Sequence, residues 1–323
     1  MRTELALSGL VLALFLAALV AASEQKEPAM TKQTPKARIE ILDDACKAAL
    51  APDAEVRQIA GGLKFTEGPA WMPEGQFLVF SDIPADTLYR WDEAGGLKVW
   101  REGSHNSNGN TVDGQGRLVT CEHGARRVTR TDKDGKVEVL ASTFSGKRFN
   151  SPNDVVVKGD GSIWFTDPPY GLPQGQQREQ DKNYVFRLDP GAKEPVVVAS
   201  DFDMPNGLCS SPDEKLLYIA DSGKPHHVRR FRVKADNTLE GGEVFTVISP
   251  GVPDGMRIDR DGRLFSTAGD GVHIFSAEGK LLGKIRTPKT AANCAFGGPD
   301  KKTLFITANS EVWAVRLNVP GAR

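Results

Sequence analysis

Six side chains that carry an oxygen suited to metal binding recur at one position of a repeated pattern. Each stands seven residues before a turn rich in Gly, Pro and Asp, and the six are Glu67, Asn108, Asn153, Asn206, Asp254 and Asn293. They comprise two carboxylates and four amides, without a thiolate or an imidazole. Such oxygens suit a hard cation such as Ca²⁺, whose charge two carboxylates would balance. The pattern therefore predicts a cation site, provided that the fold brings these positions together.

Turn capping is the alternative for any one of these residues. Five of the six are followed by Gly or Asp, and Asn, Asp and Glu before such residues commonly complete a tight turn. Turn chemistry alone would also use Ser, Thr, Lys or Gly at this position. The same phase in all six repeats therefore favours a shared role.

The turns also indicate the fold. Their spacing separates the six positions by 41, 45, 53, 48 and 39 residues, which suits four strands per repeat. A short apolar strand follows each turn, and these strands are Phe77–Phe80, Leu118–Val119, Ile163–Phe165, Leu216–Ile219, Leu264–Phe265 and Leu304–Ile306. Six such units predict an all-β, six-bladed β-propeller. Equivalent positions of its blades would then form a ring around one central channel.

The last repeat has room for only three strands before Asn318-Val319. We expect Glu55–Ile59 to supply the fourth, so that an N-terminal strand closes the last blade and no sheet edge stays open. The propeller would then occupy residues 53–320. Residues 23–52 would form a leader with a short helix around Asp43–Leu50.

Composition limits the class of protein. With 39% hydrophobic and 26% charged residues the chain should fold, and a net charge of −1 gives no basis for binding nucleic acid or an anionic membrane. The apolar run Leu5–Ala22, followed by polar residues, predicts a signal peptide over residues 1–22. An uncleaved N-terminal anchor is the alternative, and both place the body outside the cytoplasm, in the periplasm or secreted. The four widely spaced cysteines form no CxxC pair and are expected as small buried side chains.

Five ordered motifs resemble the gluconolactonase / senescence-marker-protein (regucalcin) family over about residues 55–318. They are Phe65–Trp71 (FTEGPAW), Asn150–Val155 (NSPNDV), Phe165–Pro168 (FTDP), Pro205–Leu208 (PNGL) and Pro253–Met256 (PDGM). Asn108-Gly109 and Cys121-Glu122-His123 are similar to the bacterial gluconolactonase branch in particular.

The resemblance implies a six-bladed propeller with one divalent metal at the top of the channel. Its ligands, carried over by motif, would be Glu67, Asn153, Asn206 and Asp254. Ca²⁺ is the expected ion, with Mg²⁺, Mn²⁺ and Zn²⁺ as alternatives. The implied activity is hydrolysis of sugar lactones, in which the metal polarises the carbonyl that water attacks.

The same resemblance makes Asp254 the candidate base. A carboxylate that also binds a cation is a poor base, so His123 and Asp167 on the rim are alternatives. Asn108, His123 and Arg148 are candidate substrate-binding residues, Arg148 through its likeness to a family arginine. Asn108 and Asn293 could equally complete turns. The insertion around residues 168–184 is expected to overhang the channel.

Two other functions stay open at this point. One is a non-catalytic, calcium-containing propeller that binds sugar or protein, and the other is a phosphotriesterase-like hydrolase on the same scaffold. A fold does not by itself decide between them. The chain has no G-x-S-x-G nucleophile elbow and no H-E-x-x-H zinc motif.

Overall fold

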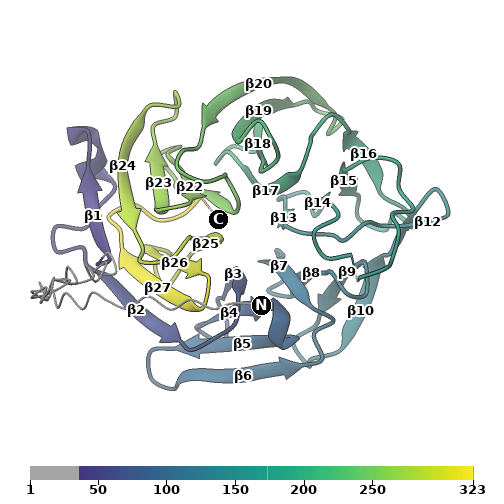
Figure 1. Cartoon of the computed structure of the whole chain (residues 1–323), viewed down its shortest axis with the longest axis horizontal. Coiled ribbons are helices and arrows are strands. Elements are labelled where there is room, and N and C mark those ends of the chain that lie inside the picture. Colours follow the sequence, from purple (N-terminus) through teal and green to yellow (C-terminus); the bar gives the residue numbers. More distant parts are fainter. Residues whose placement is uncertain (1–35, 173, 323) are drawn as a thin grey trace, which may run out of the picture. The chain divides into compact units, whose positions relative to one another are not determined.

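The computed structural model describes residues 36–172 and 174–322, which form an all-β assembly. Six antiparallel sheets are arranged around a common central axis, as Figure 1 shows. This confirms the predicted six-bladed propeller. The apolar run Leu5–Ala22 lies outside the described residues. Within the described part, no helix is long and apolar enough to cross a membrane.

Each blade contains four strands, ordered from the channel outward, and one blade has a fifth strand at its outer edge. The strands of the first three blades are β3 (Thr66–Met72), β4 (Phe77–Asp82), β5 (Thr87–Asp92) and β6 (Gly96–Glu102); β7 (Ser107–Val112), β8 (Leu118–Glu122), β9 (Arg127–Thr131) and β10 (Val137–Ala141); and β13 (Val155–Val157), β14 (Ile163–Asp167), β15 (Tyr184–Leu188) and β16 (Val196–Ala199). Those of the last three are β17 (Pro205–Ser210), β18 (Leu216–Asp221), β19 (His227–Val233) and β20 (Leu239–Val247); β21 (Met256–Ile258), β22 (Leu264–Ala268), β23 (Gly271–Phe275) and β24 (Leu281–Arg286); and β25 (Asn293–Gly297), β26 (Thr303–Ala308), β27 (Glu311–Arg316) and β2 (Val56–Gly61). The six predicted apolar strands all fall in the second strand of a blade.

The ring closes as the sequence predicts. Strand β2 pairs antiparallel with β27, and Val56 lies opposite Val315. The two ends of the propeller sequence therefore share one sheet, and the exposed edge that three strands would leave is filled.

The leader contributes more structure than the sequence indicates. Strand β1 (Arg38–Ile41) adds a fifth strand to the outer edge of β24, where Glu40 pairs with Arg286 at 2.6 Å. A 3-10 helix follows at Asp44–Ala48, capped by the Asp43 carboxylate, which accepts the N–H of Ala45. A short hairpin of β11 (Thr143–Phe144) and β12 (Lys147–Arg148) lies outside the blades, as does a 3-10 turn at Ile83–Ala85.

The hydrophobic core lies between neighbouring blades. Phe149, Phe165 and Phe186 pack with ring centroids 5.2–5.3 Å apart, against Val119 and Val128 of the preceding blade. All four cysteines are buried and free, which confirms their expected role as small core side chains.

Glycines let the innermost strands approach one another closely. A Cβ on Gly109 would lie 2.5 Å from the carbonyl oxygen of Asn153 in the next blade, and one on Gly207 would overlap the carbonyl of Asp254. Gly109 also donates its N–H to that Asn153 carbonyl, at 2.8 Å. The glycine after an oxygen-bearing residue therefore allows the next such residue to come close.

Replacing Gly109 with alanine should force these two strands apart. We expect a loss of about 1–3 kcal/mol in the free energy of unfolding, the usual cost of overpacking. Denaturant unfolding would measure it. Gly114→Ala is the matched control, because nothing lies within 4 Å of its added methyl. Equal stability of the two variants would contradict this explanation.

Candidate metal centre

The six oxygen-bearing residues stand at equivalent starts of the innermost strands. Glu67, Asn108 and Asn206 are the second residues of β3, β7 and β17, and Asn293 is the first residue of β25. Asn153 and Asp254 lie two residues before the first residues of β13 and β21. One mouth of the channel therefore receives a side chain from every blade.

Side-chain contacts join these residues around the channel. Asn108 Nδ2 donates to Asn153 Oδ1 at 2.7 Å, and Asn153 Nδ2 donates to Asn206 Oδ1 at 2.6 Å. The Asn206 side chain in turn interacts with Asp254. On the other side, Asn293 Nδ2 donates to Glu67 Oε2 at 2.9 Å. The structure thus brings together the four residues expected as ligands and their two counterparts.

The two carboxylates of the ring repel each other in a poorly hydrated site. Burial and the nearby charge of Asp154 raise the pKa of Glu67 to about 8. Burial and the charge of Glu67 raise the pKa of Asp254 well above its ordinary value. Five ring residues are buried and Asp254 is partly exposed, inside the hollow. Without a cation, Glu67 therefore retains its proton near neutral pH, and burial also favours the protonated form of Asp254.

The donor set fits a hard divalent ion. Asn108 Oδ1 is buried and has no hydrogen-bond partner among the described residues, so an acceptor oxygen is left unsatisfied beside the ring. Among those residues no cluster holds three or more His, Cys, Asp or Glu side chains placed for a metal. A site here must therefore use amide oxygens with the two carboxylates, which matches the preference of Ca²⁺ for carboxylates and carbonyls.

His123 lies against this ring. Its Nε2 is 3.1 Å from Asn108 Nδ2 and 3.3 Å from Asn153 Oδ1. Burial lowers the pKa of His123 to about 4, so the imidazole is neutral at pH 7. Gly171 packs directly on the imidazole, and its lack of a side chain makes the room for this contact. A neutral ring here is a weak base that can still bind a hydroxyl group.

Asp167 serves a different purpose from the one considered for it. It ends β14 and accepts the N–H of Asn150 at 2.7 Å, which ties down the loop leading to Asn153. Asp82 and Asp221 end the second strands of two other blades and accept backbone N–H groups in the same way. Burial raises the pKa of Asp167 to about 7, but this repeated geometry makes it a loop anchor.

Arg148 makes its contacts away from the ring. The side chain is exposed, its guanidinium donates to the carbonyl of Ala125 at 3.0 Å, and its backbone N–H donates to Glu179 at 2.8 Å. Its predicted role in substrate binding stays a prediction.

Two residues at the ring were not singled out from the sequence. Ser222 accepts a hydrogen bond from Asn206 Nδ2 at 2.9 Å, and Tyr170 interacts with the side chains of both Asn206 and Ser222. Tyr170 begins the insertion in the third blade, so part of this loop does reach the channel mouth. The sequence places the segments that contain Tyr170 and Ser222 at the rim of the channel, but it does not indicate which of their side chains reach the ring.

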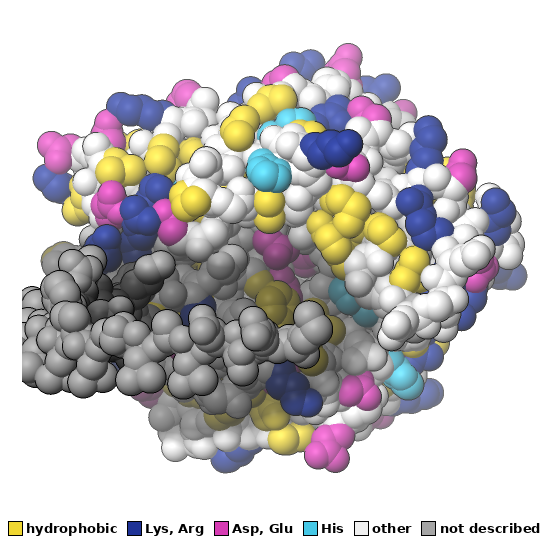
Figure 2. Space-filling view, in the orientation of Figure 1, with side chains coloured by type: hydrophobic (Ala, Val, Ile, Leu, Met, Phe, Trp, Pro, Cys, Tyr) yellow, Lys and Arg dark blue, Asp and Glu magenta, His cyan; other side chains and the backbone are white. Residues whose placement is uncertain are grey.

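Figure 2 shows the propeller face hollowed at its centre, with acidic side chains and a histidine inside the hollow. The opening is therefore lined by carboxyl and amide groups, whereas the blades around it are packed with apolar side chains. An enclosed acidic hollow of this kind attracts a cation.

Comparisons with known proteins identify the family of this chain. A family model described as the SMP-30/Gluconolactonase/LRE-like region matches residues 65–310. A gluconolactonase from Zymomonas mobilis is 33% identical over 302 residues, which cover 85% of this chain and 84% of the relative.

Solved structures also include a similar gluconolactonase. A gluconolactonase from Xanthomonas campestris is 38% identical, with a TM-score of 0.83 over 89% of this chain and 99% of that one. A calcium-binding regucalcin from Agrobacterium tumefaciens is 20% identical, with a TM-score of 0.69 over 83% of this chain and 95% of that one, and this likeness shows the fold alone. The chain therefore belongs to the SMP-30/gluconolactonase/LRE-like family.

Proposed function

We propose that Glu67, Asn153, Asn206 and Asp254 hold one divalent ion, Ca²⁺ by preference, and that the chain uses it to hydrolyse sugar lactones. The hydrolytic activity follows from the family: the chain is a sugar lactone lactonase. The observation that carries the metal proposal is the pair of partly desolvated carboxyls with raised pKa values, joined to amide oxygens from the other blades. A divalent cation would take the place of their protons.

When bound, the cation would polarise the lactone carbonyl and stabilise negative charge on its oxygen. The protein groups must then place the lactone and accept a proton from the attacking water. Asp254 is the ring carboxylate that water reaches, since it alone of the six is partly exposed. Asp167 is fully buried and accepts a hydrogen bond from its own loop, and His123 has a low pKa. We therefore assign the proton acceptor to Asp254.

The remaining polar groups of the hollow suit a polyhydroxylated ring. Asn108 and His123 lie side by side and can exchange hydrogen bonds with sugar hydroxyls. Tyr170 and Ser222 approach Asn206 from the rim and would contact the far side of the substrate. These groups would orient the lactone, which is the part of catalysis that positioning supplies.

Removing either carboxylate should abolish most of the activity. We expect kcat/KM for glucono-1,5-lactone to fall about a hundredfold or more in Glu67→Gln and in Asp254→Asn, the usual effect of losing a general base or a metal. Hydrolysis would be measured with Ca²⁺ and with a chelator.

The matched controls are Glu74→Gln and Asp261→Asn, which change exposed carboxylates that pair with Lys133 and Arg263. Both should retain wild-type rates. Unchanged hydrolysis in Glu67→Gln or Asp254→Asn, or in wild type with chelator, would reject the metal mechanism. A panel of aldonolactones, aryl esters and phosphotriesters with Ca²⁺, Mg²⁺, Mn²⁺ and Zn²⁺ would define the substrate and the ion.

The raised pKa values predict how metal-free protein responds to pH. Folding favours the protonated form of Glu67, so the stabilisation is complete below its ordinary pKa of 4.5 and is lost as pH rises through about 8. We expect the Tm of chelator-treated protein to fall from pH 6.5 to 8, and added Ca²⁺ to raise it most at pH 8.

The pH range begins at 6.5 because of His123. Its lowered pKa makes the folded protein more stable as pH rises towards the ordinary value of 6.5, which is opposite to the effect of Glu67. Glu67→Gln should flatten the response, because it removes one titrating group. A Tm that rises between pH 6.5 and 8 in metal-free wild type would contradict the assignment.

We also propose that the chain is exported. The apolar run Leu5–Ala22 and the small residues at its end support cleavage by a signal peptidase. N-terminal sequencing of protein recovered from an expressing bacterium should begin at Ser23 or Glu24. Retention of Met1 in membrane-bound protein would instead establish an uncleaved anchor.

A further inference from the structure

A second cavity opens at the opposite end of the same channel. It has a volume of about 470 Å³ and is lined by the final residues of the innermost strands, among them Trp71, Val112, Val157, Ser210, Arg257 and Phe296. We call it the basal pocket. Trp71 lies four residues along β3 from Glu67, about 13 Å at the usual strand rise. The lining begins at Pro69, two residues beyond Glu67, but includes none of the six ring residues, and the volume of the basal pocket suits a small molecule.

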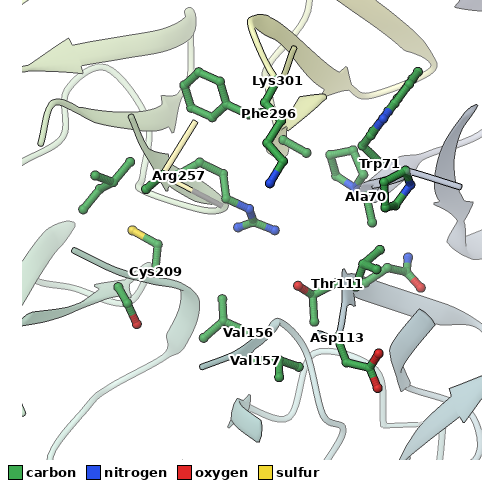
Figure 3. Close-up of a pocket in the computed structure, with 18 of the residues that line it drawn as sticks. Ala70, Trp71, Thr111, Asp113, Val156, Val157, Cys209, Arg257, Phe296 and Lys301 are labelled. Carbon is green, nitrogen blue, oxygen red and sulfur yellow. The ribbon is translucent and has the colours of Figure 1, made fainter. Parts of the chain in front are cut away.

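Two cationic side chains enter the basal pocket from neighbouring blades. Figure 3 shows the guanidinium of Arg257 and the amino group of Lys301 pointing into its centre. Arg257 Nη1 donates to the Met256 carbonyl at 2.7 Å, and the nearest carboxylate oxygen, of the buried Asp154, is 3.9 Å away. Among the described residues, no ion pair or side-chain hydrogen bond involves Lys301.

The acidic side chain of the basal pocket does not neutralise these cations. Asp113 lies at its edge, but its carboxylate accepts the N–H groups of Gln115 and Arg117 and pairs with the Arg117 guanidinium at 2.7 Å. The negative charge of Asp113 is therefore neutralised by Arg117 within the same turn. The pocket keeps an excess of positive charge, which favours an anion.

The rest of the lining is largely apolar. Trp71 stacks on Phe305 with ring centroids 5.5 Å apart, which holds its indole in place at one side. Phe296 and Val156 lie on other sides of the pocket. Such surfaces favour a ligand with an apolar body, and the cations would bind its charged end.

We propose that the basal pocket binds a small organic carboxylate that carries an apolar body. A guanidinium matches a carboxylate through two parallel hydrogen bonds, and one ammonium can add a third. Phosphate is less suited, because its higher charge calls for more donors than Arg257 and Lys301 present among apolar neighbours. An aldonate, the product of lactone hydrolysis, would offer the carboxylate but only a polyhydroxylated body, so the apolar lining favours a metabolite from outside this reaction.

The test uses cyclohexanecarboxylate as the probe and metal-free full-length protein, so that no cation at the other channel mouth can bind the carboxylate. Calorimetry should show saturable binding, and the fluorescence of Trp71 should change with it. In Lys301→Gln we expect about tenfold weaker binding, the effect of losing one charge-assisted hydrogen bond. Trp71→Phe should lose most of the fluorescence change while calorimetric binding persists.

Lys302→Gln is the matched control, because Lys302 adjoins Lys301 but does not line the basal pocket. It should bind like wild type, and both lysine variants should hydrolyse lactone at the wild-type rate. Cyclohexylmethanol, the neutral analogue, should bind at least tenfold more weakly than the carboxylate.

Several results would overturn the proposal. They are no saturable binding up to about 10 mM, equal binding of the alcohol, unchanged affinity in Lys301→Gln, or an equal loss in Lys302→Gln. Gluconate serves as the second arm. Gluconate binding as tight as that of the cyclohexane compound would refute the requirement for an apolar body, whereas binding of the cyclohexane compound alone would support it and place the source of the carboxylate outside the reaction.

Discussion

Two carboxyl groups share one poorly hydrated hollow at a mouth of the channel, and this placement constrains every other residue of the candidate metal centre. Glu67 and Asp254 come from the first and fifth blades; the charge of Glu67 raises the cost of ionising Asp254, and the charge of the buried Asp154 does the same for both. Burying such charges is unfavourable unless a proton or a cation compensates them. The amides of the intervening blades add oxygen without adding charge. The same arrangement that opposes ionisation of the carboxyls would therefore favour the proposed divalent ion.

Close packing of the innermost strands makes this arrangement attainable. Gly109 and Gly207 each follow a ring residue and leave room for the backbone of the next blade. In each pair, the ring residue supplies a side-chain oxygen and the glycine allows the close contact between strands. The carboxylates that end the second strands, such as Asp167, tie down the loops that lead into the ring. Strand β2 completes the last blade. Without it, that blade would have three strands and an exposed outer edge.

The sequence predicts most of this architecture because its turn signals repeat in phase with the side-chain oxygens. The second strands, the closing strand at Val56 and the convergence of Glu67 with Asp254 all follow from that phase. Strand β1 does not, since four residues with partly exposed isoleucines give too short a pattern and its partner is distant in sequence. Tyr170 and Ser222 reach the ring through the conformations of two separate loops, which no local spacing encodes. The loop-anchoring role of Asp167 emerges only when its backbone partners are seen.

The basal pocket was also beyond sequence reasoning, because the ends of the innermost strands carry no common residue type. The same six strands that present oxygens at one mouth present Arg257 and apolar side chains at the other. Arg257 connects the two ends electrostatically, since its positive charge lowers the pKa values of both Asp154 and Glu67. An anion bound beside Arg257 would offset that charge and would make the electrostatic potential at the ring more favourable for a cation. Because such coupling is reciprocal, a cation at the acidic mouth and a carboxylate at the basic mouth would each favour the binding of the other.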